Sequence, residues 1–339
     1  MPTLNVVVLY DRWEDEGEDT AGDKAPLTRT LDKKEVEEEV EDALGKLGHQ
    51  ATLHCLDGST KSLHALARME CDLVFNLAES FAGNDTADAS IAGYLELLGK
   101  RFTGAGSHGL IYAQDKAIAK KILEFHGIHT PVFARLYRGR LDFSHDLEFP
   151  VIVKPAREDG SIGIEFNAVV NSIRELMERI DWLHANFDSP VMIEEYVDGR
   201  EMYVGVLGNG SPAALPVVEL DLSKLPEGTP RIAGAEVKWA KGTKAYRDTK
   251  SAVAENLPDE TAATLQQTAV AVFQALELRD YARIDMRLRP DGRVAVIEAN
   301  PNPWLASKAE FAIAARKAGR TYPQLIGEIA ELALARYGA

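Results

Sequence analysis

The sequence predicts an α/β protein with two or three structural units. Strand-like and helix-like segments alternate over the N-terminal third, which indicates a parallel sheet with covering helices. A second series of strand-like runs starts at Pro150, after a polar turn that contains Pro131. The chain has 339 residues, 45% of them hydrophobic and 27% charged. This is typical of a globular protein with units of about 100–150 residues each.

The first unit is expected to begin with a buried strand followed by an amphipathic helix. The strand is the continuous apolar run Leu4–Tyr10, and the helix spans Asp32–Gly48 with apolar residues three or four apart. The first residue of that helix and Glu35 have the spacing of a capping box. A strand at Asp72–Leu77 and a helix at Ala87–Leu98 continue the alternation.

An acidic segment connects the first strand to the first helix. Asp11–Asp23 holds seven acidic residues against one basic residue, Arg12. We favour a solvated surface segment, and the alternative is a lid or a part of the substrate site.

The later elements follow from the same patterns. The apolar run after Pro150 marks the start of a new unit, and a long amphipathic stretch precedes the C-terminal hairpin. The expected strands are Val151–Val153, Val191–Val197, Met202–Leu207 and Leu215–Leu220, and the expected helices are Gln114–Gly127 and Asp259–Leu278.

Charge and composition exclude several classes of function. The chain has 38 basic and 53 acidic residues, a net charge of −15, which disfavours nucleic acids and anionic membranes as partners. Cys55 and Cys71 form neither a metal-site spacing nor a disulfide framework. No run is long and apolar enough for a membrane span, and no signal peptide is apparent. We expect a cytoplasmic protein that binds small molecules.

The segment Tyr281–Asn300 is predicted to form a β-hairpin. Asp291-Gly292 is the dipeptide that favours a two-residue type I′ loop. That loop sets the register: one face of the ribbon is apolar, and the other places Asp285 opposite Glu298. The expected pairs are Ile284 with Ala299, Met286 with Ile297, Leu288 with Ala295, and Arg283 with Asn300.

The opposed carboxylates of Asp285 and Glu298 predict a metal site. Like charges directly opposite each other destabilise a sheet unless something neutralises them. Mg²⁺ takes oxygen ligands and often uses one or two carboxylates plus substrate phosphates. Asn300, on the same strand face as Glu298, adds an amide oxygen. The alternative is a solvated pair of acids flanked by arginines, and we favour the metal.

Three further motifs are candidates for nucleotide binding. Lys154 ends a buried strand and precedes a loop with Gly160, Ser161 and Gly163, a composition suited to phosphate; the alternative is a surface lysine and an ordinary loop. The acidic residues in Val191–Glu201 could accept hydrogen bonds from ribose hydroxyls or from the adenine amino group; the alternative is a strand edge with solvated acids. Gly104, Gly106 and Gly109 match Gly-x-Gly-x-x-Gly, but no buried strand precedes them, so a loop at a unit boundary explains them equally well.

Taken in order, five motifs resemble the ATP-grasp superfamily, and within it the D-alanyl-D-alanine ligase-like group. They are Lys116, VIVKPA with GSIG, EEYVDGRE, ARIDMRL and VIEANPNP, and the resemblance extends from about Leu73 to Leu334. It implies a three-unit ATP-grasp architecture, with an N-terminal parallel α/β domain followed by two α+β subdomains. The implied divisions are 1–104, on the substrate side, 105–194, the central lid, and 195–339, which carries the metal site.

The resemblance also implies chemistry and residue roles. ATP would lie between the central and C-terminal units with two Mg²⁺ ions, or Mn²⁺, and an acyl phosphate would be attacked by an amine. The resemblance also implies a homodimer. The implied assignments are Lys116, Lys154 and Lys238 at the phosphates, Ser161 in the closing loop, Glu194 at adenine, Glu201 at ribose, Asp285, Glu298 and Asn300 at the metals, and Arg283 at the developing negative charge.

The departures from the family pattern concern the substrates. Tyr10–Thr20 replaces a Gly-Gly-x-Ser-x-Glu-His-like segment, and Asn76–Ser80 replaces a His-Gly-x-x-Gly-Glu-Asp-Gly segment. Trp304 stands where the family has glycine, and Ala309 where it has serine, with Ser307 close by. Candidate substrate residues are therefore Ser307, Glu79 and, in the acidic segment, Glu14, Glu16 or Glu18.

The expected function is an ATP-dependent ligase that forms an amide bond between the carboxylate of one amino acid or small peptide and the amine of another, releasing ADP and phosphate. Two alternatives stay open. One is a D-alanyl-D-alanine ligase proper, and the other is a nucleotide-binding protein that lacks ligase activity.

Overall fold

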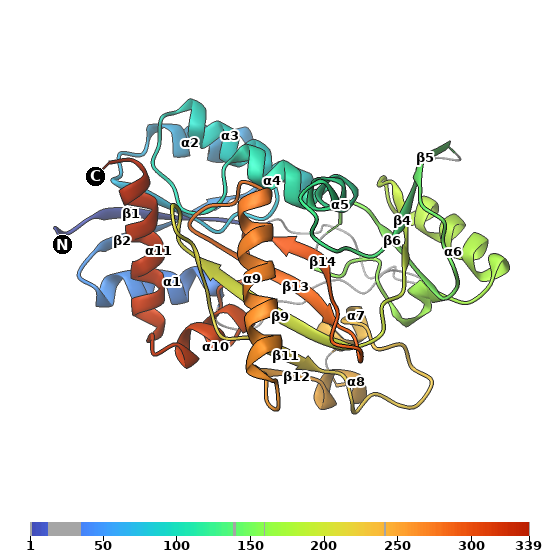
Figure 1. Ribbon diagram of the computed structural model, residues 1–339. Coiled ribbons are helices and arrows are strands. Elements are labelled where there is room, and N and C mark those ends of the chain that lie inside the picture. Colours follow the sequence, from blue (N-terminus) through green and yellow to red (C-terminus); the bar gives the residue numbers. More distant parts are fainter. Residues whose placement is uncertain (1, 13–34, 138–139, 159, 241, 339) are drawn as a thin grey trace.

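The computed structural model describes residues 2–12, 35–137, 140–158, 160–240 and 242–338. They form three sheets, each covered by helices, and the C-terminal sheet lies between the N-terminal sheet on the left and the central sheet on the right (Figure 1). Among these residues no helix is long and apolar enough to cross a membrane. The predicted α/β class is confirmed.

The N-terminal sheet is parallel, as predicted, with the strand order β2-β1-β3. Side chains of β1 alternate between its two faces: Val6 and Val8 pack towards α1, whereas Leu9 packs in the core on the other face. Burial on both faces explains why this strand is a continuous apolar run. The elements are β1 (Asn5–Asp11), α1 (Val36–Lys46), β2 (Gln50–Leu56), α2 (Thr60–Arg68), β3 (Leu73–Asn76), the 3₁₀ turn Asp85–Ala87 and α3 (Asp88–Leu97).

Two details of this unit differ from the sequence prediction. The helix predicted from Asp32 starts at Val36 in the described residues, and Glu35 is its N-cap residue without a side-chain capping bond. Asp32 itself lies outside the described residues, as does most of the acidic segment. The strand β2 and the helix α2 were not predicted, because their apolar residues form no long run, and most of them, apart from Leu56 and Leu66, are not fully buried.

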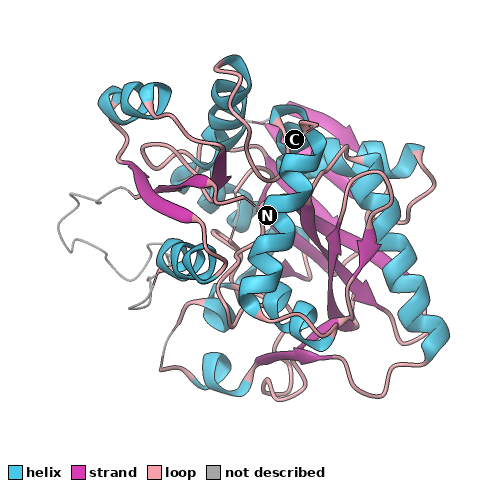
Figure 2. Ribbon diagram, turned by 90° about the vertical axis from the view of Figure 1, so that its left-hand side faces the viewer, coloured by secondary structure: helices cyan, strands magenta, loops and turns pink. Residues whose placement is uncertain are grey.

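The last helix, α11 (Tyr322–Arg336), packs against the N-terminal unit. It lies beside α1 and β3, where Leu325 and Ile329 share a core with Val40 and Phe75. Both termini therefore lie at the same end of the molecule (Figures 1 and 2).

The central sheet is antiparallel, in the order β5-β4-β8-β6-β7. Helix α6 (Ile173–Asn186) covers one face, where it meets Val153 and Ile193. Because side chains alternate along a strand, Lys154 and Glu194 emerge on the opposite face. The strands are β4 (Phe133–Tyr137), β5 (Arg140–Ser144), β6 (Val151–Pro155), β7 (Val169–Val170) and β8 (Val191–Glu195), and the 3₁₀ turn Phe166–Ala168 precedes β7.

The C-terminal sheet is also antiparallel, with the order β12-β11-β9-β13-β14 and β10 paired to β9. Helix α9 (Asp259–Ala275) packs on one face against Ile284 and Met286, and Arg283 and Asp285 lie on the other. The remaining strands are β9 (Arg200–Leu207), β10 (Ala213–Ala214), β11 (Val218–Asp221), β12 (Lys250–Val253), β13 (Tyr281–Leu288) and β14 (Val294–Asn300).

Short helices connect the three sheets. The helix predicted at Gln114–Gly127 is the second of two consecutive helices, and it begins at Lys116, while the first ends at Gln114. The side chain of Asp115, between them, accepts from the Ile118 amide at 3.1 Å and caps the second helix. This cap fixes where the second helix, and with it Lys116, begins. The short helices are α4 (Ser107–Gln114), α5 (Lys116–Phe125), α7 (Ala235–Lys238), α8 (Lys244–Asp248) and α10 (Glu310–Lys317).

The predicted loop of the C-terminal hairpin is wrong by one residue. Arg289 pairs with Arg293, and the three residues Pro290–Gly292 form the loop, with the Gly292 amide donating to the Arg289 carbonyl at 2.9 Å. Gly292 has a φ of +83°, which suits the left-handed position that ends a three-residue loop. Pro290 has no N–H and favours the first central position of such a turn, so it cannot take the paired position that a two-residue loop requires.

A β-bulge then restores the predicted pairing at the other end of the hairpin. The register shifts between Asp285 and Met286, which leaves Ile297 without a partner. Asp285 is consequently opposite Glu298, as predicted. The corrected pairs are Met286 with Val296 and Leu288 with Val294, and the confirmed ones are Ile284 with Ala299 and Arg283 with Asn300.

Candidate active site

The predicted phosphate and metal residues converge where α5 lies between the central and C-terminal sheets. Lys116, the first residue of α5, places its Nζ 2.7 Å from Glu298 Oε1 on β14. On the central sheet, Lys154 Nζ lies 3.1 Å from Glu194 Oε2. Residues far apart in sequence are thus joined into one charged cluster.

Lys120 completes this cluster and was missed by the sequence analysis. It lies one turn after Lys116, is only 2% exposed, and its Nζ is 3.6 Å from Glu194 Oε2. The same nitrogen donates to the carbonyls of Val296 and Ile297, both at 3.3 Å. Lys120 therefore holds the β-bulge that sets Glu298 opposite Asp285. The only sequence signal was its spacing of four residues from Lys116.

Glu194 is buried between two lysines. Its residue exposure is 1%, and its carboxylate pairs with Lys154 and Lys120. Burial lowers the pKa of Lys120 to about 8, although Glu194 acts in the opposite direction. The carboxylate is thus occupied by lysines, and its predicted contact with adenine stays a prediction.

The carboxylate of Glu298 is held in its charged form. Burial alone raises its pKa, but Lys116 and, after it, Lys154 and Lys238 lower the pKa to about 2. The Lys116 ammonium also donates to the Glu158 carbonyl at 2.7 Å. Lys116 therefore ties β14 to the loop that follows β6.

Asp285 is held by Arg283 in a two-pronged ion pair. Arg283 Nε donates to Asp285 Oδ1 at 2.7 Å and Nη2 donates to Oδ2 at 2.9 Å. Burial raises the pKa of Asp285 even with this arginine beside it. The guanidinium also lies over the ring of Tyr203, 4.9 Å from its centre. The ion pair with Asp285 and the contact with Tyr203 together fix the orientation of the guanidinium plane.

The third donor of Arg283 points to an acid that the sequence analysis did not select. Arg283 Nη1 is 3.5 Å from Glu310 Oε2, and Ser251 Oγ donates to Glu310 Oε1 at 2.8 Å. Burial raises the pKa of Glu310, but Arg283 and then other donors more than offset it, so the pKa is lowered. Glu310 is the first residue of α10, which explains why no strand pattern indicated it.

Glu201 and Lys238 lie at the same face of the C-terminal sheet. Glu201 Oε2 is 2.6 Å from Arg287 Nη2, and burial raises the pKa of Glu201 while Arg287 opposes this effect. Lys238 ends α7 and is close enough to lower the pKa values of Glu201, Asp285 and Glu298. The predicted contacts of Glu201 with ribose and of Lys238 with phosphate stay predictions.

The glycine-rich loop after β6 is fastened to the segment that carries Lys238. Ser161 Oγ donates to the Ala233 carbonyl at 2.8 Å, and the indole Nε1 of Trp239 donates to the Gly160 carbonyl at 2.7 Å. The Ala235 amide donates to the Ile164 carbonyl at 2.7 Å. Gly160 and Ser161 both have positive φ, 62° and 64°, so the loop turns sharply beside Trp239.

The oxygen donors of the site suit a hard divalent cation. Asp285 and Glu298 are directly opposed on β13 and β14, and Asn300 is two residues further along β14. Within the described ranges no cluster of three or more His, Cys, Asp or Glu side chains has metal-binding geometry. Two carboxylates and an amide oxygen are the kinds of ligand that Mg²⁺ takes together with substrate phosphates and water. In this structure Arg283 pairs with Asp285 and Lys116 with Glu298, so the metal assignment stays a prediction.

The two predicted substrate residues lie near the N-terminal unit. Ser307 donates from its amide and its hydroxyl to Glu39 on α1, at 2.6 and 3.1 Å. The amide of Glu79 donates to Asp11 at 2.7 Å. Ser307 thus lies at the junction of the first and last units, and Glu79 follows Ala78, whose carbonyl accepts from Asn302 at 3.3 Å. Their contact with substrate stays a prediction. Glu14, Glu16 and Glu18 lie outside the described residues.

The Gly-x-Gly-x-x-Gly segment is a loop that leads into α4: Gly106 is the N-cap residue, and Gly109 lies within the helix. The Gly104 amide donates to Asp280 Oδ2 at 2.8 Å, and Arg279 Nε donates to the Gly104 carbonyl at 3.0 Å. These bonds join the loop to the C-terminal sheet, which matches the unit-boundary explanation.

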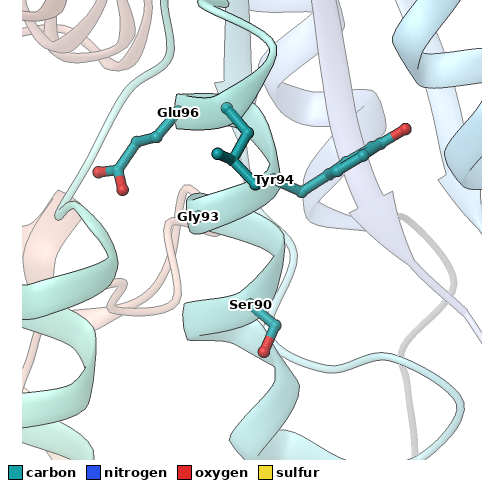
Figure 3. A pocket seen from close by; sticks show the side chains of 5 residues that line it. Ser90, Gly93, Tyr94 and Glu96 are labelled. Carbon is teal, nitrogen blue, oxygen red and sulfur yellow. The ribbon is translucent and has the colours of Figure 1, made fainter.

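A hollow on the outer side of α3 is separate from this chemistry. It has a volume of about 580 Å³ and is lined by Ser90, Gly93, Tyr94, Glu96 and Leu97. Tyr94 and Glu96 point to opposite sides of the helix (Figure 3). Glu96 pairs with Arg279 at 3.6 Å, and the clustered lysines do not line the hollow.

Comparison with known proteins identifies the family. The model of the D-ala D-ala ligase C-terminus matches residues 126–331, more than half of the chain. The D-alanine–D-alanine ligase of Cupriavidus pinatubonensis is 32% identical over 281 residues, which cover 81% of this chain and 80% of that protein. The chain belongs to the D-alanine–D-alanine ligase family. Members of this family are ATP-dependent carboxylate–amine ligases, and the chain is an enzyme of that class.

Two other proteins are similar to this chain over most of its length. The protein y4sG of Sinorhizobium fredii, whose name gives no function, is 34% identical over 304 residues, 87% of this chain and 86% of that one. The crystal structure of the D-alanine–D-alanine ligase from Bacillus anthracis, complexed with ATP, superposes with a TM-score of 0.74 over 99% of both chains at 24% identity. That likeness confirms the ATP-grasp fold.

Proposed function

We propose that the protein uses ATP to activate the carboxylate of one amino acid or small peptide and joins it to the amine of a second molecule. In the first step a carboxylate oxygen attacks the γ-phosphorus of ATP, and ADP leaves. In the second step the amine nitrogen attacks the acyl carbon, a C–N bond forms, and phosphate leaves with the electrons of the C–O bond while the amine loses a proton. The observation that carries this proposal is the joined cluster of Lys116, Lys154, Asp285 and Glu298.

The lysines would bind the phosphates from two sides. Lys116 and Lys154 come from α5 and β6, and Lys238 from α7, so their ammonium groups approach from different elements. Because these cations are held before the reaction begins, they stabilise the charge of the transferred phosphoryl group without reorganisation. We propose that Glu194 acts through Lys154 and Lys120, as a positioning residue.

Asp285, Glu298 and Asn300 would hold the divalent cation, of which the resemblance implies two, Mg²⁺ or Mn²⁺. When bound, the cation neutralises phosphate charge and orients the transferred group. Arg283, held by Asp285, would face the developing negative charge on the reacting carbonyl. Glu201 would accept from the ribose hydroxyls, and Ser161 would close the glycine-rich loop over the phosphates, so that ATP lies between the central and C-terminal sheets.

D-alanine as both substrates is the second candidate. It is favoured by the D-alanine–D-alanine ligases that are about one third identical to this chain. It is disfavoured by the replaced substrate segments and by Trp304 and Ala309 at positions where the family has glycine and serine.

A phosphate-release screen tests the proposal. The enzyme is incubated with ATP, Mg²⁺ and pairs of D- and L-amino acids, and product masses are measured. We expect ADP, phosphate and one amide product per turnover, and D-alanine alone suffices if the second candidate holds. Binding of ATP without ADP formation across the panel, including dipeptides, would contradict the proposal.

A further inference from the structure

We propose that Asp115 is a positioning residue of the phosphate site, whose carboxylate holds Lys116 at a fixed place relative to Lys154. This inference rests on the proposed function, in which both lysines bind the phosphates of ATP. In this assignment Asp115 makes no contact with the nucleotide and acts only through Lys116.

The carboxylate of Asp115 joins three separate elements. Its Oδ1 accepts from the Ile118 amide at 3.1 Å, in the first turn of α5. Its Oδ2 lies 3.1 Å from Nε of Arg157, in the loop after β6, and 3.2 Å from Nη2 of Arg135 on β4. The residue is only 6% exposed, so these three contacts compensate a buried charge and fix its orientation.

Lys116, the next residue, is bonded to the same loop by its backbone and by its side chain. Its amide donates to the Ala156 carbonyl at 3.1 Å, and its Nζ donates to the Glu158 carbonyl at 2.7 Å. Lys154 lies two residues before Ala156, near the end of β6. The first turn of α5 and the end of β6 are therefore one bonded unit, to which the Asp115 carboxylate adds the ionic link.

The packing of α5 is divided between two parts of the molecule. Ala117 shares a small core with Phe133 and Met192 of the central sheet, whereas Ala119 and Leu123 belong to the core that contains α9. Packing alone therefore does not fix the first turn of α5 against the central sheet, and the capped carboxylate with its two arginines does. A misplacement of about 1 Å in a positioned group is enough to cost much of its effect.

Equilibrium binding of ATP with Mg²⁺ tests the inference, because it reports the phosphate contacts without the ligation reaction. The dissociation constant is measured by titration calorimetry for the wild type, Asp115→Ser, Lys116→Met and the double variant. Serine keeps a capping hydroxyl but is too short and uncharged to hold the arginines.

We expect Asp115→Ser to raise the dissociation constant for ATP about tenfold, the effect of weakening one hydrogen bond to a charged group. Because Asp115 acts only through Lys116, the same change should have no further effect in the Lys116→Met background. Such non-additivity distinguishes a positioning role from two independent contributions.

Ser172→Ala is the matched control, because it removes the N-cap of α6, which covers the opposite face of the central sheet. It should lower the melting temperature and leave the dissociation constant for ATP unchanged. A purely structural role of Asp115 predicts that same pattern for Asp115→Ser. If the serine variant does not fold, Arg157→Gln, at a side chain that is 44% exposed, repeats the test with an expected rise of about threefold.

The results separate this inference from the proposed function. No binding of ATP by the wild type, or an unchanged dissociation constant in Lys116→Met, would contradict the proposed phosphate site and the inference with it. An unchanged constant in folded Asp115→Ser, or a further rise when this change is combined with Lys116→Met, would overturn the inference alone. An unchanged constant in Arg157→Gln, where that variant replaces the serine one, would do the same.

Discussion

The two sides of the candidate site are built in different ways. On the phosphate side, Lys116, Lys120, Lys154 and Glu194 are each no more than 4% exposed and come from α5 and from two strands of the central sheet, β6 and β8. On the side that carries the departures from the family pattern, Glu310 starts a helix, and Trp304, in the loop before it, is 40% exposed.

This difference separates what the enzyme does from what it acts on. Buried charges need fixed partners, because an uncompensated buried ion costs several kcal/mol, so the phosphate side tolerates little variation. Residues on helix ends and loops can change without disturbing a sheet. The departures from the family pattern at Trp304 and Ala309 lie on this second side.

The largest expected effect is on the metal pair. Asp285→Asn removes one of two carboxylates that would bind the cation, and cations contribute several kcal/mol to transition states of this kind. We expect ATP turnover to fall by at least about 100-fold, measured as ADP formation. Asp291→Asn, an exposed acid in the loop of the same hairpin, should retain activity. Equal turnover in Asp285→Asn and wild type would refute the metal assignment.

The next effect concerns the buried lysine that supports the metal pair. Lys120→Met leaves Glu194 with one cation and the bulge carbonyls without their donor, so we expect a loss of about 3 kcal/mol in the free energy of unfolding. The Mg²⁺ concentration for half-maximal activity should also rise, because the bulge positions Glu298. Urea denaturation and Mg²⁺ titration measure the two effects. The neighbouring exposed Lys121→Met is the control, and similar values for both variants would mean that Lys120 has no positioning role.

A smaller effect is expected at the loop that joins the two sides. Trp239→Phe keeps an aromatic ring but loses the hydrogen bond to the Gly160 carbonyl, which is worth about 1 kcal/mol. We therefore expect KM for ATP to rise about fivefold, with a fall of at most a few degrees in the melting temperature. Steady-state kinetics at saturating amino acid provide the measurement. An unchanged KM would indicate that the loop closes without this bond.

The smallest expected effect is on the pH dependence of stability, at a residue outside both sides of the site. Burial raises the pKa of Asp88 at the start of α3 from 3.8 to about 7, so the folded state binds this proton more tightly than the unfolded state. Stability should then fall as pH rises from about 4 to 7. Asp88→Asn removes this loss. At pH 8 the variant should be more stable than the wild type by about 1 kcal/mol, which corresponds to a melting temperature a few degrees higher. Scanning calorimetry at pH 4 and pH 8 measures the melting temperatures of both proteins. An equal difference at the two pH values would contradict the titration of Asp88 as its cause.

Sequence reasoning predicted the pairing of Asp285 with Glu298 although it placed the loop incorrectly. The two-residue loop was one residue too short, and the bulge at Ile297 compensated for that residue. The apolar face was nevertheless recognisable, because alternation of side chains is a local property of the strand.

What could not be predicted depends on contacts between distant segments. Lys120 meets the bulge across 176 residues of sequence, and Ser307 meets Glu39 across 268. No local pattern shows which lysine of α5 becomes buried. Nor does one show that Arg283 pairs with Glu310 as well as with Asp285. The weakly apolar β2 was missed for a related reason, since its partial burial gives no clear periodicity.

The position of α11 constrains how the chain reaches its native state. The helix completes a hydrophobic core that contains Val40 and Phe75 of the first unit together with side chains of the C-terminal sheet and α10. During synthesis on the ribosome, that core stays open until residues 322–336 have emerged, so the first unit made is among the last to be finished. Contacts of such large sequence separation slow folding, and a fragment that ends before this helix would expose Val40 and Phe75 to solvent.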